Sequence, residues 1–166
     1  TITKVGLKTF VDPRIEGAKM NERSKEDLVE LMHIDGEEWL RYKSFPLNVA
    51  LIRATYCDED GNATMEKEAA TLDSLSIAQA AKNSGGIVLL QVEKVVQNGT
   101  LDPRKVKIPG IYVDGIVVAR PENHWQTYAN PYDPALSGEV KVPVNSIAPM
   151  KLNERKVICR RAAMEL

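Results

Sequence analysis

The side chains that could carry chemistry are spread thinly along this sequence. Its two histidines, His33 and His124, lie far apart, and neither stands beside a serine, cysteine or carboxylate in a nucleophile motif. Cys57 and Cys159 stand alone, without the paired spacing of a zinc site or a disulfide framework. For both residue types we favour structural or surface roles, and we expect no metal site.

Acidic residues gather in two places. Residues 58–60 lack the alternating ligands and the distal glutamate of a calcium loop, so we interpret them as a solvated turn. Glu66 and Glu68 begin an Ala- and Leu-rich stretch, where carboxylates stabilise the N-terminal end of a helix. The pair Gly85–Gly86 follows that stretch instead of opening it, and therefore indicates a helix end and no phosphate loop. Residue types and spacing alone reveal no catalytic constellation.

Hydrophobic periodicity predicts the elements that would position a site. Apolar runs at 49–54 and 87–92 flank a helical stretch at 66–83, which predicts a βαβ unit in a parallel sheet. Further strands are expected at 2–7, 38–43, 106–108 and 111–118, and a short amphipathic helix is expected from Ser24 to about Asp35. The predicted fold class is therefore α/β, with a parallel or mostly parallel sheet flanked by helices.

Composition and hydrophobic periodicity divide the sequence into three parts. Residues 1–120 carry the α/β pattern, whereas residues 121–150 are proline-rich, follow no period and indicate a loop or linker. Residues 151–166 predict a helix with Asn153 as its N-cap and no stop signal before Leu166, so we expect a helix that is cut there.

Composition excludes several classes of function. Lys and Arg total 22 against 23 for Asp and Glu, and the charges are interspersed, so we expect no nucleic-acid partner. No apolar run approaches the ~20 residues that span a bilayer, so we expect no membrane partner. The isolated cysteines fit a reducing compartment, and we expect a cytoplasmic location.

Several segments resemble, in the same order, those of propionate and acetate CoA-transferases. Residues 6–14 (Gly-Leu-Lys-Thr-Phe-Val-Asp-Pro-Arg) are similar to the G-x-x-T-F-V-D-P-R stretch of that family. The resemblance continues through Gly17, 19–22, 25–28, 50–55, 58–62, 83–88 and 108–114, the last of which is also similar to a run in 3-oxoacid CoA-transferases. The departure is Lys8, where the resemblance implies glycine.

The resemblance implies an acyl-CoA:carboxylate CoA-transferase, which moves CoA between a short-chain acyl-CoA and a carboxylic acid through a glutamyl-CoA thioester. The family's nucleophilic glutamate lies in a T-V-E-S/T-G-P motif that no segment here matches. We therefore expect an internal piece, inactive alone and without a catalytic residue. Residues 1–120 would be the later part of the first α/β domain, 121–150 its linker, and 151–166 the start of the second domain.

The same resemblance implies the binding partners. Coenzyme A would be substrate and covalent intermediate, without a metal, and acyl-CoA and small carboxylic acids would be the ligands. The rest of the parent chain or a second subunit would complete the enzyme, and we expect a homo-oligomer. The loop 9–21 follows an expected strand at its carboxyl end, where open α/β sheets place ligands, so Phe10, Lys19 and Asn21 are candidate CoA-binding residues.

Three alternatives stay open. The loop 9–21 is equally explained as a rigid surface connection fixed by Pro13. The chain as a whole could be a non-catalytic α/β scaffold or binding module that contacts a partner through residues 121–149. A second chain could also supply the glutamate. If the chain alone catalysed CoA transfer, Glu66, Glu68 and Glu93 would be the candidate nucleophiles.

Overall fold

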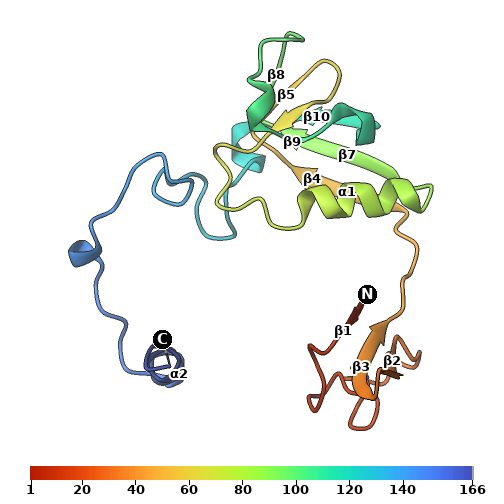
Figure 1. The fold of residues 1–166 in the computed structure, drawn as a ribbon. Helices are drawn as coiled ribbons and strands as arrows, with labels where there is room; N and C mark the ends of the chain where they lie inside the picture. The colour runs from red at the N-terminus through yellow and green to blue at the C-terminus, as the bar shows by residue number, and fades with distance from the viewer. Residues whose placement is uncertain (166) are drawn as a thin grey trace.

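The computed structural model describes residues 1–165 and confirms the α/β fold class. Figure 1 shows three parts along the chain: a small N-terminal β unit (residues 1–43), an α/β body (residues 47–120) and an extended C-terminal segment that ends in a helix. Leu166, which the sequence placed in the last helix, lies outside the described residues. Within residues 1–165 no helix is long and apolar enough to cross a membrane.

A three-stranded parallel sheet forms the centre of the α/β body, in the order β10-β7-β4. The strands are β4 (Val49–Arg53), β7 (Ile87–Val92) and β10 (Gly115–Val118), and α1 (Ser74–Asn83) connects the first two. The register places Leu90 between Ile52 and Ile116. The predicted βαβ unit is therefore confirmed.

The glycine pair ends α1, as predicted. The Gly86 N–H donates to the Ala81 carbonyl at 2.8 Å and the Gly85 N–H donates to the Lys82 carbonyl at 3.0 Å, which is the Schellman pattern of a helix C-terminus. Gly85 has a φ of +74°, and a Cβ on Gly86 would lie 2.3 Å from the Leu47 carbonyl oxygen. The backbone conformation therefore favours glycine at position 85, and the close approach of the Leu47 carbonyl requires it at position 86.

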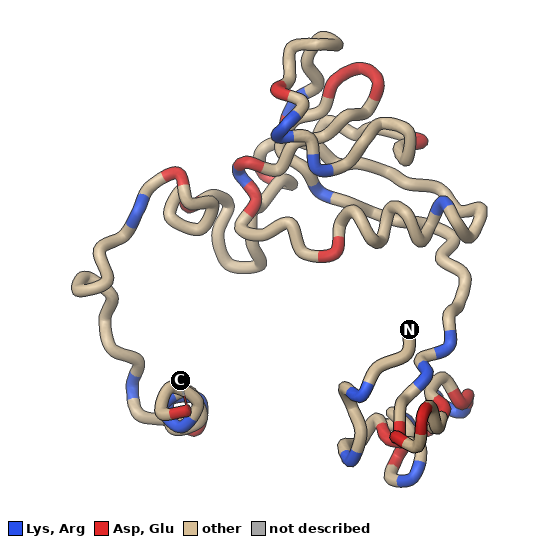
Figure 2. Tube along the Cα trace, viewed as in Figure 1, with Lys and Arg blue, Asp and Glu red and all other residues tan. Residues whose placement is uncertain are grey.

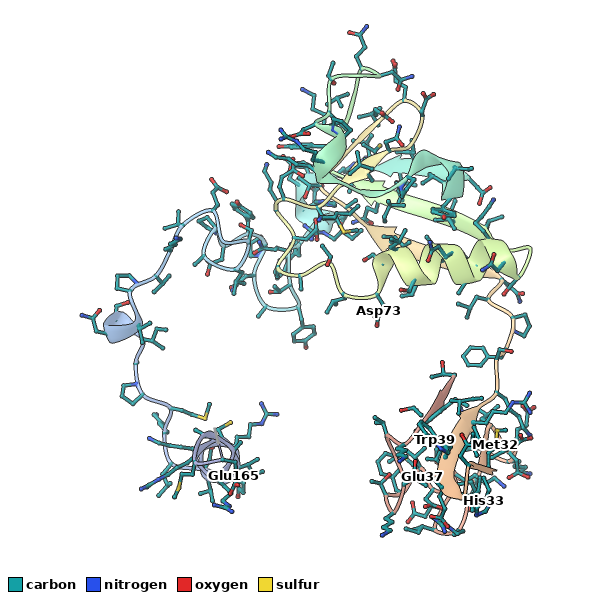
Figure 3. The ribbon with its side chains drawn as sticks, viewed as in Figure 1. Met32, His33, Glu37, Trp39, Asp73 and Glu165 are labelled. Carbon is teal, nitrogen blue, oxygen red and sulfur yellow. The ribbon has the colours of Figure 1, made fainter. Side chains whose placement is uncertain are left out.

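The start of α1 differs from the prediction, because residues 66–73 are not helical. The Thr55 hydroxyl accepts the Lys67 N–H at 3.0 Å, and the Glu68 carboxylate pairs with Arg53, so these residues are held against the end of β4. Leu72 then has a φ of +45°, which no helical residue adopts. Figure 3 shows Asp73 at the resulting start of α1.

A second sheet, in the order β8-β5-β6-β9, packs beside the first. Its strands are β5 (Tyr56–Asp58), β6 (Ala63–Thr64), β8 (Lys94–Val96) and β9 (Val106–Ile108). The predicted turn joins β5 to β6, but Asp58 is buried and not solvated. Its carboxylate accepts the backbone N–H groups of Asp60 and Asn62, at 3.1 and 2.8 Å. The strand predicted at 111–118 also begins later, because residues 110–112 form a 3₁₀ turn.

The N-terminal β unit contradicts the helix predicted from Ser24 to Asp35. Its antiparallel strands, in the order β1-β3-β2, are β1 (Ile2–Thr3), β2 (Val29–Ile34) and β3 (Glu37–Tyr42). Asp35 and Gly36 have φ values of +52° and +81°, which suits a two-residue hairpin turn and pairs Met32 with Trp39. Figure 3 shows these two side chains in the unit. The turn thus overrides the helical spacing of the apolar residues.

The C-terminal segment has little regular structure before its helix. Among residues 121–165 the structure describes two 3₁₀ turns, Pro121–Asn123 and Val144–Ser146. Two further 3₁₀ turns, Pro103–Lys105 and Gly110–Tyr112, belong to the α/β body. The helix α2 (Glu154–Ala163) begins as predicted, with the Asn153 side chain accepting the Lys156 N–H at 2.9 Å. The helix ends at Ala163, and Met164 is its C-cap. This differs from the prediction of a helix with no stop signal before Leu166.

The two faces of the parallel sheet differ. One face packs on α1 through the fully buried Ala78 and Ala81, and Leu90 lies in this core. The other face exposes Val49, Leu51, Ile87 and Val117. Parallel sheets are usually covered on both faces, so this apolar face is unusual for a chain considered alone.

Because one face is buried and the other exposed, truncating a leucine to alanine should have a large effect on stability on one face and a small effect on the other. Leu90→Ala removes a fully buried side chain and should lower the free energy of unfolding by about 2–5 kcal/mol. Leu51→Ala is the matched control, since Leu51 is 78% exposed, and should change it by less than about 0.5 kcal/mol. Urea denaturation followed by circular dichroism measures both, and equal losses would contradict the described packing.

Candidate functional site

Charged residues gather where the parallel strands end. Arg53 is the last residue of β4, Glu93 follows β7 directly, and Ala119 follows β10 directly. Because the strands are parallel, these ends meet at one edge of the sheet, which is where open α/β folds bind ligands. A pocket of about 380 Å³ lies there, lined by Arg53, Lys67, Glu93, Ala119, Pro121, His124, Pro131 and Tyr132.

Arg53 is held in place by a buried carboxylate. Its guanidinium pairs with Glu68, whose side chain is only 8% exposed, and also donates to the His124 carbonyl at 3.1 Å. Burial raises the pKa of Glu68, while the Arg53 charge and the Thr55 hydroxyl act to lower it. Glu68 is thus a partner of Arg53, and the helix-start role predicted for it is wrong.

Lys67 is the second cation of the pocket. Its ammonium lies 2.9 Å from each carboxylate oxygen of Glu93, and 5.3 and 5.9 Å from the ring centroids of Tyr56 and Tyr132. Hydrogen bonds to Tyr56 and Glu93 raise the pKa of Lys67, so it stays charged at neutral pH. The Lys67 carbonyl also accepts a hydrogen bond from Gln126 at 2.7 Å, which fixes its backbone.

His124 anchors the chain that closes the pocket. Its Nδ1 lies 3.2 Å from the Gln91 side-chain nitrogen, which also donates to the Asn123 carbonyl at 3.1 Å. Burial lowers the pKa of His124, so the ring is neutral at pH 7. His33, by contrast, is exposed on β2. The structural or surface roles predicted for both histidines agree with these positions.

The cysteines lie away from this pocket. Cys57 is buried in β5, and burial raises the pKa of its thiol to about 11. Cys159 is exposed on α2. Both are free thiols.

The candidate CoA-binding residues lie in the N-terminal β unit, and the reason for choosing them is wrong. The preceding strand β1 belongs to an antiparallel sheet, so the loop does not lie at the carboxyl edge of the parallel sheet. Phe10 is half-exposed, Lys19 pairs with Asp27 at 2.5 Å, and the Asn21 side chain accepts the Arg23 N–H at 2.9 Å. They do not line the pocket described above. Their contact with CoA stays a prediction.

Asp12 organises that loop. Its side chain is buried, accepts the Lys8 N–H at 2.9 Å, and binds the Arg14 guanidinium at 2.8 and 3.0 Å. Arg14 in turn pairs with Glu38 of β3 at 2.7 Å. These contacts tie the loop to the sheet, which is consistent with a rigid connection and leaves the CoA-binding alternative untested.

Lys8 adopts the backbone conformation that glycine prefers. Its φ is +62°, within the left-handed region that a Cβ disfavours. Glycine was the residue implied at this position by the resemblance. The departure therefore affects backbone strain in a turn of the N-terminal β unit.

Comparison with known proteins agrees with this fold. A sequence profile described as coenzyme A transferase matches residues 1–119. Caffeate CoA-transferase of Acetobacterium woodii is 56% identical over 166 residues, which are 99% of this chain and 32% of that protein. Acetate CoA-transferase subunit alpha of Escherichia coli K12 is 34% identical over 115 residues, covering 69% of this chain and 48% of that subunit.

Among solved structures, the apoenzyme of the acyl-CoA transferase YdiF from Escherichia coli O157:H7 superposes with a TM-score of 0.81 and 45% identity. The match covers 100% of this chain and 31% of that one. This chain therefore spans about a third of the length of its full-length relatives.

The Asp12 cluster predicts an acid-sensitive loop. Hydrogen bonds from Arg14 hold the pKa of Asp12 far below its usual value, so its stabilisation is complete above the unfolded pKa of ~3.9 and is lost as pH falls toward the lower folded value. Asp12→Asn should therefore destabilise the protein near neutral pH and weaken the pH dependence of stability below ~4. Thermal unfolding of both proteins at several pH values measures this; parallel curves would contradict it.

Lys8→Gly should raise the free energy of unfolding by about 0.5–1 kcal/mol. Removing the Cβ relieves the strain of the left-handed backbone conformation (~1–2 kcal/mol). This gain outweighs the larger conformational entropy that glycine adds to the unfolded chain (~0.5–1 kcal/mol). Lys8→Ala is the matched control, since it removes the same charge and keeps the Cβ. Urea denaturation of the three proteins separates the two causes. A gain in Lys8→Ala equal to that in Lys8→Gly would assign the effect to charge instead.

Proposed function

The chain belongs to the coenzyme A transferase family, and on that premise we propose that it is part of an acyl-CoA:carboxylate CoA-transferase acting on short-chain acids. The observation that carries the CoA-transfer reaction is the 56% identity to a caffeate CoA-transferase across the whole chain. Caffeate is an aromatic acid, so that relative supports the reaction and not the short chain of the acid. The relative named acetate CoA-transferase YdiF, 45% identical over 165 residues, supports a small carboxylic acid as substrate.

The proposed reaction uses a glutamate that lies outside these 166 residues. Its carboxylate attacks the acyl-CoA carbonyl, which releases the CoA thiolate and leaves an acyl-glutamyl anhydride. The thiolate attacks the glutamyl carbonyl, releasing the first acid and forming a glutamyl-CoA thioester. An incoming carboxylate then reverses both steps. A solved YdiF structure described as a thioester complex with CoA supports such an intermediate.

This chain would contribute one wall of the active site. Its carboxyl edge presents two cations, Arg53 and Lys67, beside apolar residues, and so suits an anionic acid with a short hydrocarbon tail. Figure 2 shows that elsewhere positive and negative residues are interspersed over all three parts of the molecule. The free thiols Cys57 and Cys159 fit a reducing compartment, so a cytoplasmic location is part of the proposal.

A second chain that supplies the glutamate is the alternative favoured by a specific finding. One relative is named as subunit alpha of an acetate CoA-transferase, and this chain covers 48% of it. In that arrangement the catalytic glutamate and the edge described here would meet at a subunit interface. A homo-oligomer of complete chains is the other proposed assembly.

Acyl transfer separates these possibilities. Acetyl-CoA and propionate are supplied to two purified proteins, the 166-residue chain and the longer protein that contains it. Intact mass spectrometry confirms that the shorter sample is the 166-residue chain. We expect propionyl-CoA from the longer protein alone, because only it would carry the glutamate. Transfer that appears only after a second chain is added would favour the two-chain alternative, and no transfer in any combination would favour a non-catalytic scaffold. Transfer by the pure 166-residue chain would overturn the proposal and return Glu66, Glu68 and Glu93 as nucleophile candidates.

A further inference from the structure

The two cations of the pocket differ in how firmly they are bound. Arg53 is 24% exposed and is held by Glu68, whose side chain is only 8% exposed, and by a backbone carbonyl. Lys67 is 33% exposed, and its carboxylate partner Glu93 is 45% exposed. Solvent-exposed ion pairs contribute little free energy, so a ligand can displace Glu93 from Lys67 far more readily than Glu68 from Arg53.

The Lys67 ammonium nevertheless keeps a defined position. It lies over the rings of Tyr56 and Tyr132, at 5.3 and 5.9 Å from their centroids, within the range of cation–π attraction. Its backbone carbonyl is fixed by Gln126, which is itself buried. Lys67 is therefore a preorganised cation whose anionic partner is exchangeable.

The rest of the pocket suits a small organic acid. Ala119, Pro121, Pro131 and the Tyr132 ring supply apolar walls beside Lys67, in a volume of about 380 Å³. A phosphate would need several donors, whereas a carboxylate is matched by one ammonium and an apolar tail by these walls. His124 is neutral and adds no competing positive charge.

We propose that this pocket is the subsite for the free carboxylic acid and that Lys67 binds the carboxylate, replacing Glu93 as its partner. The inference deepens the proposed function and rests on it for the identity of the reaction. It assigns to Glu93 a competing role: its carboxylate occupies the ammonium when no acid is present.

The test is steady-state kinetics of the longer protein with propionate and acetyl-CoA varied separately. Lys67→Met should raise the KM for propionate about tenfold, the loss of one charged hydrogen bond, and leave the KM for acetyl-CoA within about twofold. Lys67→Arg should restore most of the affinity for propionate that Lys67→Met loses.

Glu93→Gln should lower the KM for propionate, because it removes the carboxylate that competes for the Lys67 ammonium. Lys82→Met is the matched control and should change neither KM, since Lys82 pairs with Asp114 at 2.7 Å beside the amino end of β7.

Three results would overturn the inference. The KM for propionate could be unchanged in Lys67→Met, or the KM for acetyl-CoA could rise equally in that variant, which would indicate that Lys67 binds the phosphates of CoA. The third is a raised KM for propionate in Glu93→Gln. Saturation-transfer NMR of propionate with the same proteins measures binding without catalysis. A signal that Lys67→Met abolishes and Lys82→Met retains supports the subsite, and equal signals overturn it. A longer protein that binds propionate through Lys67 but transfers nothing would overturn the proposed function alone.

Discussion

The buried carboxylate of Glu68 constrains the whole carboxyl edge of the sheet. A buried negative charge is stable only when it is paired, and the partner here is the last residue of β4, Arg53. Holding Glu68 at that position keeps residues 66–73 out of the helix and delays the start of α1 to Ser74. The same guanidinium binds the His124 carbonyl, so the ion pair also determines where the chain after β10 crosses the pocket.

Because that crossing is fixed, residues beyond the α/β body become part of the site. Gln126 binds the Lys67 carbonyl through its side-chain nitrogen, and its side-chain oxygen accepts the Asp133 N–H at 2.9 Å. Pro131 and Tyr132 then complete the pocket wall. The segment expected to be a loop or linker is therefore bound to the α/β body near its start, through His124 and Gln126, while residues 141–150 are exposed.

The sequence predicts the centre of the fold well because its periodic signals agree with the tertiary structure. The apolar runs of β4 and β7 and the glycines that end α1 each specify one conformation. The prediction fails where a side chain bonds to a distant partner or a turn overrides periodicity. Leu28, Leu31 and Met32 have helical spacing, yet the Asp35–Gly36 turn pairs Leu31 and Met32 with β3. Similarly, no local pattern reveals that Glu68 meets Arg53, 15 residues away in the chain.

The candidate site was missed for the same reason, although a signal was present. Arg53 follows the apolar residues 49–52 and Glu93 follows the run 87–92, and in a parallel sheet such positions meet at one edge. Once the two runs are assigned to neighbouring parallel strands, the first polar residue after each becomes a site candidate from the sequence alone. Phe10, Lys19 and Asn21 follow from the same rule applied to the wrong strand, since β1 pairs with β3 in an antiparallel sheet. The rule itself is sound; which strands share a parallel sheet is decided by hydrogen bonds between distant residues, and that information is absent from any single stretch of sequence.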